Sequence, residues 1–465
     1  MPRQELGDIA AGRLPAEQLA ENFDDISPPL DRQAALIAAQ RCFYCYDAPC
    51  IKACPTGIDI PSFIRRITTD NLRGAATDIL GANIFGGMCS RVCPTEILCE
   101  GSCVRNRPED APVQIGALQR YATDWVFQDD AKLFERGADT GMLVAVVGAG
   151  PAGLACAHAL ARAGHRVVVF DAHEKAGGLN EYGIAHYKVL GFAAREIAWL
   201  LSIGGIEVRH GQALGRNLAL SDLRRDFCAV FLAIGLAGVN ALGIEGETLG
   251  GVRNAVDFIA ELRQSPDLAR LPIGRRVVVI GGGNTAIDAA VQSKKLGAES
   301  VTLAYRRGAA SMSATFAERE FAQTQGVNLI EWVQPRRMLG VNGSVGAVEF
   351  EYTRLDTGGR LAGSGETLTL SADLVLKAVG QALAAPSETP QIEKGRIVVN
   401  ENYATSLPGV WAGGDCVGSA VDLTVQAVED GKRAARSIDQ ALRQRAGSSS
   451  SPLLAAREPA QTIKA

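Results

Sequence analysis

Fully apolar segments that end on glycine or an acid predict the strands of parallel sheets in this sequence. Residues 143–148 (LVAVVG) and 166–171 (RVVVFD) flank an Ala- and Leu-rich helical stretch, which together make one β-α-β unit. The same pattern returns further along the chain in residues 275–307. Two more apolar segments, residues 229–235 and 374–380, also end on glycine, as strands buried on both faces of a sheet do. The chain therefore predicts two α/β units.

The N-terminal part of the chain has a different pattern. Apolar residues recur at a spacing of three to four in residues 16–26 and 30–41, which predicts amphipathic helices. A polar stretch, residues 129–141, predicts a linker before the first strand. Beyond the second α/β unit, residues 423–438 predict a helix, and residues 446–465 predict a flexible tail.

Length and charge limit the classes of function. The 465 residues predict about three folding units at roughly 150 residues each. A net charge of −4 provides no basic surface for nucleic acid or an anionic membrane. No apolar run approaches the ~18 residues of a spanning helix, and the N-terminus lacks the pattern of a secretion signal. We therefore expect a cytoplasmic protein that binds neither nucleic acid nor membrane.

The first α/β unit carries a glycine loop between its strand and its helix. The loop fits G-x-G-x-x-G with Gly148, Ala149, Gly150, Pro151, Ala152 and Gly153. Glycine at these positions lets the backbone approach a pyrophosphate at the helix N-terminus. Asp171 ends the next strand and is placed to accept a hydrogen bond from a ribose hydroxyl. The alternative is a glycine-rich turn in an ordinary α/β sheet, but strand, helix and acid are all in register for a dinucleotide site.

The second α/β unit carries a second loop, and its strand ends differently. This loop consists of Gly281, Gly282, Gly283, Asn284, Thr285 and Ala286. Its second strand ends in Arg306 and Arg307, which predict binding of the 2′-phosphate of NADP or, alternatively, form a solvated strand end. Two loops predict one flavin and one nicotinamide cofactor. Gly413-Gly414-Asp415, between a strand and a helix, is placed to face the flavin or its phosphates.

Eight of the 11 cysteines lie within 62 residues of the N-terminal part. They form two groups, which are Cys42, Cys45, Cys50 and Cys54, and then Cys89, Cys93, Cys99 and Cys103. A disulfide scaffold is not expected, because such scaffolds are short secreted chains. Structural zinc is the alternative, but zinc sites favour paired C-x2-C arms and only one such arm is present. A Cys-Pro after a tight cysteine run is typical of iron–sulfur ligation, so we expect two 4Fe–4S clusters.

Residues 141–440 resemble the flavoprotein reductases with two dinucleotide-binding domains. In these proteins the NAD domain is inserted into the FAD domain, and the order of the loops here matches. The resemblance implies an α/β two-dinucleotide-binding-domain flavoprotein preceded by an α-helical 4Fe–4S domain. The implied parts are a cluster domain (1–135), an FAD-binding domain (141–250 and 385–445), an NAD(P)H-binding domain (251–384) and the tail (446–465).

The whole chain except its last twenty residues resembles two kinds of subunit. One is the small subunit of glutamate synthase, and the other is the N-terminal half of dihydropyrimidine dehydrogenase, which bacteria carry as a separate subunit. The five-residue gap between Cys93 and Cys99 and the segment 114–119 (QIGALQ) are similar to the dehydrogenase. Some electron-bifurcating reductase subunits share the same gap.

The dehydrogenase resemblance implies a crossed set of cluster ligands. The first cluster would be held by Cys42, Cys45, Cys50 and Cys103. The second would be held by Cys54, Cys93, Cys99 and Gln119, which leaves Cys89 free. The alternative for Gln119 is a plain residue on a helix surface.

The same resemblance implies the cofactor-binding residues. For FAD they are Val92, Gly148 to Gly153, Asp171, Gly178, Leu179, Lys188, Leu214, Gly414, Asp415 and Thr424. For the nicotinamide cofactor they are Gly282, Gly283, Asn284, Thr285, Arg306, Arg307, Ala378, Val379 and Gly380. Three residues depart from the family: Asp171 replaces Glu, Lys188 replaces Arg, and Ser313 stands where the NADP-using animal enzyme has Arg. Because the bacterial two-subunit enzymes use NAD, we expect NAD(H), with NADP(H) as the alternative.

The resemblance implies an electron-input subunit of dihydropyrimidine dehydrogenase. It would pass electrons between NAD(P)H, FAD and two 4Fe–4S clusters to an FMN-bearing catalytic subunit, in a heterotetramer that interconverts uracil or thymine and their 5,6-dihydro forms. Hydride transfer between cofactors needs no acid–base side chain, so we assign no catalytic residue. The alternatives are a subunit like the glutamate synthase small subunit, an electron-bifurcating NAD(P)H oxidoreductase subunit, and a non-enzymatic flavin-bearing scaffold.

Overall fold

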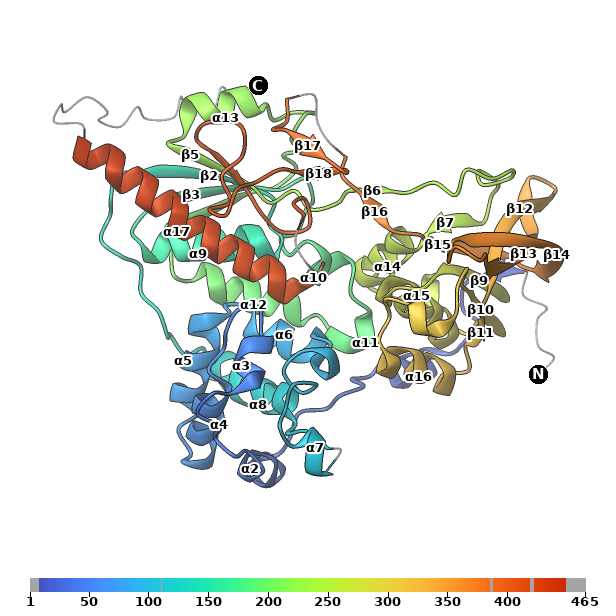
Figure 1. Cartoon of the computed structure of the whole chain (residues 1–465), viewed down its shortest axis with the longest axis horizontal. Coiled ribbons are helices and arrows are strands. Elements are labelled where there is room, and N and C mark those ends of the chain that lie inside the picture. Colours follow the sequence, from blue (N-terminus) through green and yellow to red (C-terminus); the bar gives the residue numbers. More distant parts are fainter. Residues whose placement is uncertain (1–7, 110, 385–387, 419–421, 449–465) are drawn as a thin grey trace.

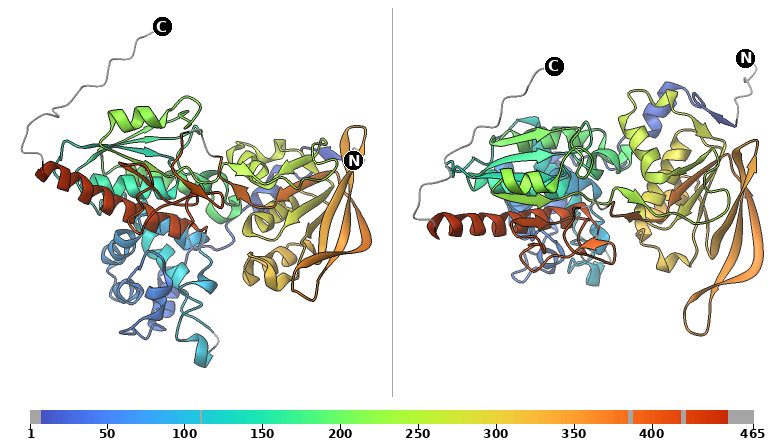
Figure 2. Two further views of the ribbon diagram at one scale, coloured as in Figure 1. Left: turned by 45° about the horizontal axis from the view of Figure 1, so that its top comes forward. Right: turned by 90° about the horizontal axis from the view of Figure 1, so that it is seen from above.

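Two five-stranded parallel sheets organise most of the chain, and a bundle of helices lies beside the first of them (Figure 1). The computed structural model describes residues 8–109, 111–384, 388–418 and 422–448. Figure 2 shows the two sheet-containing units next to each other and the helical bundle packed under the first.

The first unit has the strand order β19-β5-β2-β3-β4. Its strands are β2 (Leu143–Val147), β3 (Arg166–Phe170), β4 (Ile206–Arg209), β5 (Ala229–Leu232) and β19 (Val410–Ala412). On one face lie α9 (Pro151–Arg162), α12 (Phe192–Leu201) and α17 (Thr424–Ser448), and on the other α13 (Leu220–Asp226). The short helices α10 (Leu179–Tyr182) and α11 (His186–Val189) precede α12, and the hairpin of β17 (Ile392–Glu393) and β18 (Arg396–Ile397) precedes β19.

The second unit has the strand order β11-β10-β9-β15-β7. Its strands are β7 (Val252–Asn254), β9 (Arg276–Gly281), β10 (Ser300–Ala304), β11 (Asn328–Ile330) and β15 (Leu374–Ala378). One face is covered by α14 (Ala255–Gln264), α15 (Asn284–Lys295) and α16 (Phe316–Thr324). The other face packs on an antiparallel sheet of β12 (Val333–Val341), β13 (Ser344–Leu355) and β14 (Leu361–Ser371), which the sequence analysis did not anticipate.

The second unit is inserted into the first. The chain leaves the first sheet after β5 and returns to it as β19, which pairs with β5 in parallel register. The two crossing segments, β6 (Gly238–Val239) and β16 (Gln381–Ala382), pair with each other antiparallel. This is the expected order of an FAD-type unit interrupted by a nicotinamide-type unit.

The cysteine-rich part is helical, as expected. Its helices are α2 (Arg32–Gln40), α3 (Pro49–Ala53), α4 (Ile60–Thr68), α5 (Leu72–Ala82), α6 (Gly86–Val92), α7 (Asn106–Glu109) and α8 (Ile115–Gln128), with a 3-10 turn at Thr95–Ile97. Fully buried Phe63, Ile64, Ile79 and Leu118 form the centre of its core. Residues 129–142, all of them described, form neither helix nor strand, in agreement with the predicted linker.

The first described residues pack on the second α/β unit and not on the cysteine helices. β1 (Ile9–Ala10) pairs with β8 (Ile273–Gly274), and α1 (Ala16–Asn22) follows it. Leu19 and Phe23 are buried in the core of the second unit, because the apolar face of α1 has no other surface to cover. The structure therefore differs from the expected division at this end: residues 8–23 belong with the inserted unit.

The C-terminal helix is longer than the sequence pattern indicates. α17 runs to Ser448, three residues into the segment expected to be a tail. Residues 449–465 of that expected tail lie outside the described residues. Within the described ranges no helix is both long and apolar enough to cross a membrane.

Candidate functional site

A cavity of about 650 Å3 lies where the two α/β units and the helical part meet. Its volume is in the usual range for cofactor and ligand sites. Most of the expected cofactor residues line it: Val92, Gly148, Gly150, Pro151, Ala152, Asp171, Gly178, Leu179, Lys188, Leu214, Asn284, Thr285, Gly414, Asp415 and Thr424. The structure thus brings both glycine loops to one cavity, although they are far apart in the sequence.

The first loop lies so close to its surroundings that glycine is required at two positions. Gly148 has a φ of +107°, and a Cβ there would overlap the carbonyl of Ala233. A Cβ on Gly153 would overlap the carbonyl of Gly148, so the helix lies directly against the strand end. Gly150, in contrast, faces the cavity with only the Cα of Gly178 at 3.8 Å from its Cβ position. This backbone leaves the space that a pyrophosphate would occupy.

Asp171 stabilises the loop from the next strand. One carboxylate oxygen accepts from the amide of Ala149 at 2.6 Å, and the other accepts from the amide of His173 at 2.8 Å. Burial opposes ionisation, but the bonds from His173 and Ala149 outweigh it and hold the pKa of Asp171 below its usual value. The carboxylate also lines the cavity, as expected for a group that accepts from a ribose hydroxyl.

The Gly413-Gly414-Asp415 turn lies against the start of the first loop's helix. Gly414 has a φ of +75° and its Cβ position is 2.9 Å from the Cβ of Ala152. Asp430 holds the turn by accepting from the Gly414 amide at 3.0 Å. Burial, with the nearby charge of Asp422, raises the pKa of Asp415 to about 6.

The second loop is equally tight. A Cβ on Gly282 would overlap the ring of Tyr305, and one on Gly281 would overlap the carbonyl of Ala378. Ala378 to Gly380 therefore lie beside this loop, although they do not line the large cavity. Asn284 does line it, and its buried Oδ1 has no hydrogen-bond partner among the described residues. An unpartnered buried acceptor at a loop of this kind fits a missing ligand.

The basic pair after the second strand is free to bind an anion. Arg306 and Arg307 are exposed at the end of β10, directly after Tyr305. Neither guanidinium has a side-chain partner in the part of the chain that the structure describes. Ser313 lies beside the second glycine loop, since its hydroxyl oxygen is 3.2 Å from the Cβ position of Gly283.

Lys188 lines the cavity but its charge is already paired. Its ammonium is 2.8 Å from Asp288 of α15 and 2.6 Å from Glu318 of α16. Asp288 also accepts from the amide of Ala185 at 3.3 Å. Neither acid was expected from the sequence. The position of Asp288, one turn after the second loop, is a signal that could have identified it, whereas Glu318 has no sequence signal. Lys188 thus joins the two α/β units at the cavity wall.

Four thiols surround a second, smaller cavity. It is lined by Cys42, Cys45, Cys50 and Cys103, the four residues expected to hold the first cluster. Burial, with the charges of Cys42 and Cys103, raises the pKa of Cys50 to about 11. Thiolates crowded in this way need a compensating metal centre.

In the described ranges no three His, Cys, Asp or Glu side chains converge to hold a metal ion. The four thiols expected to hold the first cluster line a common space instead.

One thiol of the second group borders the large cavity, and another, Cys103, lines the small one. Cys93 lies beside Cys89; this contact, burial, and the charges of Cys99 and Cys54 raise its pKa well above the usual value. Cys93 and Val92 also form part of the wall of the large cavity. A ligand of the expected second cluster therefore faces the space lined by both dinucleotide loops.

Gln119 and Cys89 are both buried. Gln119 is only 7% exposed and donates from Nε2 to the carbonyl of Gly86 at 2.7 Å, so it is not a helix-surface residue. Its Oε1 accepts no hydrogen bond within the described residues, and its assignment as a cluster ligand stays a prediction. Cys89 is 2% exposed, and its assignment as a free thiol remains a prediction.

Two protein families match this chain. Residues 19–131 match the family described as dihydropyrimidine dehydrogenase domain II, 4Fe-4S cluster. Residues 142–431 match the family described as pyridine nucleotide-disulphide oxidoreductase. Together they confirm the expected fold class and the order of its parts.

The relatives among characterised proteins agree with these two family matches. The chain is 34% identical to the NAD-dependent dihydropyrimidine dehydrogenase subunit PreT of Salmonella typhimurium, over 90% of this chain and 96% of the relative. It is also 34% identical to the glutamate synthase [NADPH] small chain of Escherichia coli, over 90% of this chain and 93% of the relative.

Solved structures show the same fold at lower identity. FprA of Mycobacterium tuberculosis in complex with NADPH is 21% identical with a TM-score of 0.57, covering 66% of this chain and 85% of that one. Thioredoxin reductase of Lactococcus lactis is 19% identical with a TM-score of 0.50, covering 65% and 99%. With its cysteine-rich domain, its two dinucleotide loops and these relatives, the chain belongs to the pyridine nucleotide-disulphide oxidoreductases, in the group of NAD(P)H-dependent flavin and iron–sulfur enzymes that includes the PreT subunit of dihydropyrimidine dehydrogenase and the small chain of glutamate synthase.

Proposed function

We propose that this chain is the electron-input subunit of a dihydropyrimidine dehydrogenase of the cytoplasm. It takes electrons from NAD(H), holds FAD and two 4Fe–4S clusters, and delivers the electrons to an FMN-bearing partner subunit in a heterotetramer. The partner interconverts uracil or thymine and their 5,6-dihydro forms. The observation that carries the proposal is the large cavity, whose wall contains both dinucleotide loops and the cluster-side residues Val92 and Cys93.

The residues of this chain bind and orient, and none of them reacts. FAD and NAD(H), when bound, supply a hydride transfer that needs close stacking and exclusion of water. The first loop and Asp171 hold the FAD nucleotide, and the Gly414–Asp415 turn, which follows β19, faces it. The second loop, with the unpartnered oxygen of Asn284, receives the nicotinamide nucleotide. The Lys188 ion pairs hold the two units around the place where the cofactors meet.

The proposed ligand sets cross the two groups of cysteines. Cys42, Cys45, Cys50 and Cys103 hold the first cluster, and Cys54, Cys93, Cys99 and Gln119 hold the second. A neutral amide in place of a thiolate changes the charge of the second cluster and therefore its potential. Cys99 lies close enough to Cys50 for their charges to interact, which supports electron passage between the groups.

The dehydrogenase assignment is preferred to the glutamate synthase alternative on sequence spacing. Identity does not separate them, because PreT and the glutamate synthase small chain are both 34% identical to this chain. The five-residue gap between Cys93 and Cys99 and the segment containing Gln119 favour the dehydrogenase. PreT relatives are named as NAD-dependent, which supports NAD(H) against the 2′-phosphate site suggested by Arg306 and Arg307.

Reconstitution tests the proposed function. The purified chain is mixed with a candidate FMN-bearing dihydropyrimidine dehydrogenase catalytic subunit, and uracil-dependent oxidation of NADH and of NADPH is followed by the absorbance of the reduced nicotinamide. We expect oxidation only when both chains are present, and faster with NADH. Glutamine-dependent oxidation with a large amidotransferase chain instead, or uracil reduction by this chain alone, would contradict the proposal.

Replacement of Gly150 by valine tests the flavin site. Gly150 has a φ of −79° and open space at its Cβ position, so the fold tolerates a side chain that enters the cavity. We expect Gly150→Val to lower FAD affinity at least about tenfold, measured as flavin absorbance per protein after gel filtration. The matched control is Gly81→Val, whose Cβ position meets nothing within 4 Å and lies on α5, away from the cavity. Full FAD content in Gly150→Val would refute the assignment.

Serine replacements of two cysteines test the ligand set. Cys50 lines the small cavity, whereas Cys89 is buried beside Cys93 without an assigned role. We expect Cys50→Ser to lose roughly half of the bound iron and Cys89→Ser to lose none, because four of eight cluster ligands belong to each centre. Iron and acid-labile sulfide are measured per chain. Equal losses in both variants would show that the ligands are assigned wrongly.

Alanine replacements of the basic pair test nucleotide preference. The double variant Arg306→Ala, Arg307→Ala removes two exposed cations that have no other role in the described structure. We expect kcat/KM for NADPH to fall at least about tenfold more than that for NADH, because only NADPH carries the 2′-phosphate. A matched control is Arg224→Ala, an exposed cation on α13. An equal fall for both nucleotides would remove these residues from 2′-phosphate recognition.

A further inference from the structure

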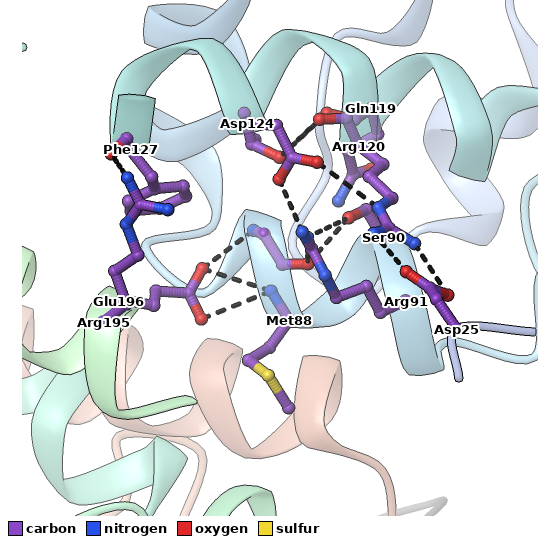
Figure 3. A network of polar contacts seen from close by, with 12 residues as sticks. Asp25, Met88, Ser90, Arg91, Gln119, Arg120, Asp124, Phe127, Arg195 and Glu196 are labelled. Atoms are coloured by element: carbon purple, nitrogen blue, oxygen red, sulfur yellow. Dashed lines mark hydrogen bonds and ion pairs between the residues drawn. The ribbon is translucent and has the colours of Figure 1, made fainter. Parts of the chain in front are cut away.

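The short helix α6 connects the cluster side of the molecule to the cavity wall. It begins at Gly86, and its C-terminal end leads into Val92 and Cys93, which line the large cavity. Its position relative to the FAD-binding unit therefore decides how close the second group of thiols lies to that cavity. Figure 3 shows α6 between α8 of the helical part and Glu196 of the FAD-binding unit.

Glu196 is the polar contact from the FAD-binding unit to the backbone of α6. Its Oε1 accepts from the amide of Gly87 at 2.8 Å, and Oε1 and Oε2 both accept from the amide of Met88 at 3.2 Å (Figure 3). The side chain is fully buried. Since a buried carboxylate is tolerated only when it is hydrogen-bonded, this contact fixes the relative position of the two elements.

The helix that carries Glu196 is itself fixed to the FAD-binding unit. Ala193, Ile197 and Leu200 of α12 lie in the core that the first sheet forms with α9 and α17. α12 also fits closely against α6, because a Cβ on Gly87 would lie 2.6 Å from the ring of Phe192. Glu196 therefore links the position of α6 to that of the first sheet.

The other side of α6 is held by α8. Gln119 donates to the carbonyl of Gly86 at 2.7 Å, and Arg91 is paired with Asp124 at 2.6 Å. Asp124 also contacts Arg120, which is paired with Asp25 at 2.6 Å. The ion pairs stay within the helical part and its N-terminal segment, while the Arg91 guanidinium also lies over the ring of Phe192, 3.7 Å from its centroid. Glu196 adds to this stacking contact the hydrogen bonds that the FAD-binding unit makes to the backbone of α6.

Glu196 has no ion-pair partner of its own among the described residues, since the nearby Arg91 is committed to Asp124. Burial raises the pKa of Glu196 to about 8, against the opposing effects of the Met88 and Gly87 amides and of Arg91. Glu196 is costly to ionise, and its two oxygens accept from two amides of α6. These contacts suit a residue that positions this helix.

We propose that Glu196 is the positioning residue that holds α6, and with it Val92 and Cys93, against the cavity that the two dinucleotide loops line. The inference rests on the proposed function in one respect, that electrons leave the cavity on this side. Each NADH would deliver one hydride, and its two electrons would pass to the clusters one at a time with release of one proton to solvent. Glu196 would take no part in the chemistry and would set the distance over which these electrons move.

Amide hydrogen exchange in the full-length protein with its cofactors tests the contact directly. We expect Glu196→Ala to speed exchange in the peptide covering residues 84–93 by about tenfold or more, because the Gly87 and Met88 amides lose their buried side-chain acceptor. The matched control is Trp199→Phe on the same helix, which removes a 3.0 Å bond to the carbonyl of Ala131 and leaves α6 untouched. We expect exchange in residues 84–93 to be unchanged in this control.

Stopped-flow kinetics in the same variants separates the two half-reactions. We expect the rate of flavin reduction by NADH to stay within about twofold in Glu196→Ala, and the following rate of cluster reduction to fall about tenfold or more. Glu196→Gln keeps one acceptor oxygen, so its exchange and its cluster reduction should lie between those of the wild type and Glu196→Ala. If the alanine variant does not fold, the comparison of Glu196→Gln with Trp199→Phe decides.

The inference fails if Glu196→Ala keeps wild-type exchange and cluster reduction, or if Trp199→Phe changes both as much. Wild-type protein whose flavin is not reduced by NADH or NADPH would refute the proposed function instead. The exchange experiment would still decide whether Glu196 holds α6.

Discussion

Two buried ionisable side chains of the FAD-binding unit make polar contacts with its neighbours, and these contacts restrict how the three parts of the molecule are arranged. Glu196 bonds the backbone of α6 in the helical part, and Lys188 is paired with Asp288 and Glu318 of the inserted unit. Removing a charge from water is costly unless it is paired or hydrogen-bonded. Both contacts are satisfied only when the three parts lie as they do here, so they specify one arrangement among the many that apolar packing alone would allow.

The N-terminal segment adds a third connection. Residues 8–23 pack on the inserted unit, and the chain then reaches the cysteine helices through Asp25, which is paired with Arg120 of α8. Arg120 and Arg91 share Asp124, so the series of ion pairs runs from this segment to α6. These ion pairs therefore connect the segment that packs on the inserted unit to the helix that leads to Cys93.

The chain contains two cavities whose linings differ in chemistry. The large cavity is lined by backbone that approaches closely, with glycine where a side chain would collide, as nucleotide phosphates require. The small cavity is lined by thiols whose burial and mutual repulsion make their ionised form costly without metal. Cys93 belongs to the thiols and also borders the large cavity, so the two chemistries meet at one residue.

The sequence by itself determined the apolar strands β2, β3, β5, β9, β10 and β15, both glycine loops, the Gly413-Gly414-Asp415 turn and the two cysteine groups, and the family resemblance supplied the insertion of one unit into the other. The features read from the residues are local, because a continuous apolar run or a glycine at a fixed position follows from the backbone within a few residues. Only the tertiary structure decided what holds the parts together. The bond from Glu196 to Gly87 joins residues 109 positions apart, and α1 packs on a unit that begins more than 200 residues later. Such contacts have no sequence pattern of their own, because a carboxylate or an amphipathic face finds its partner only when the chain has folded.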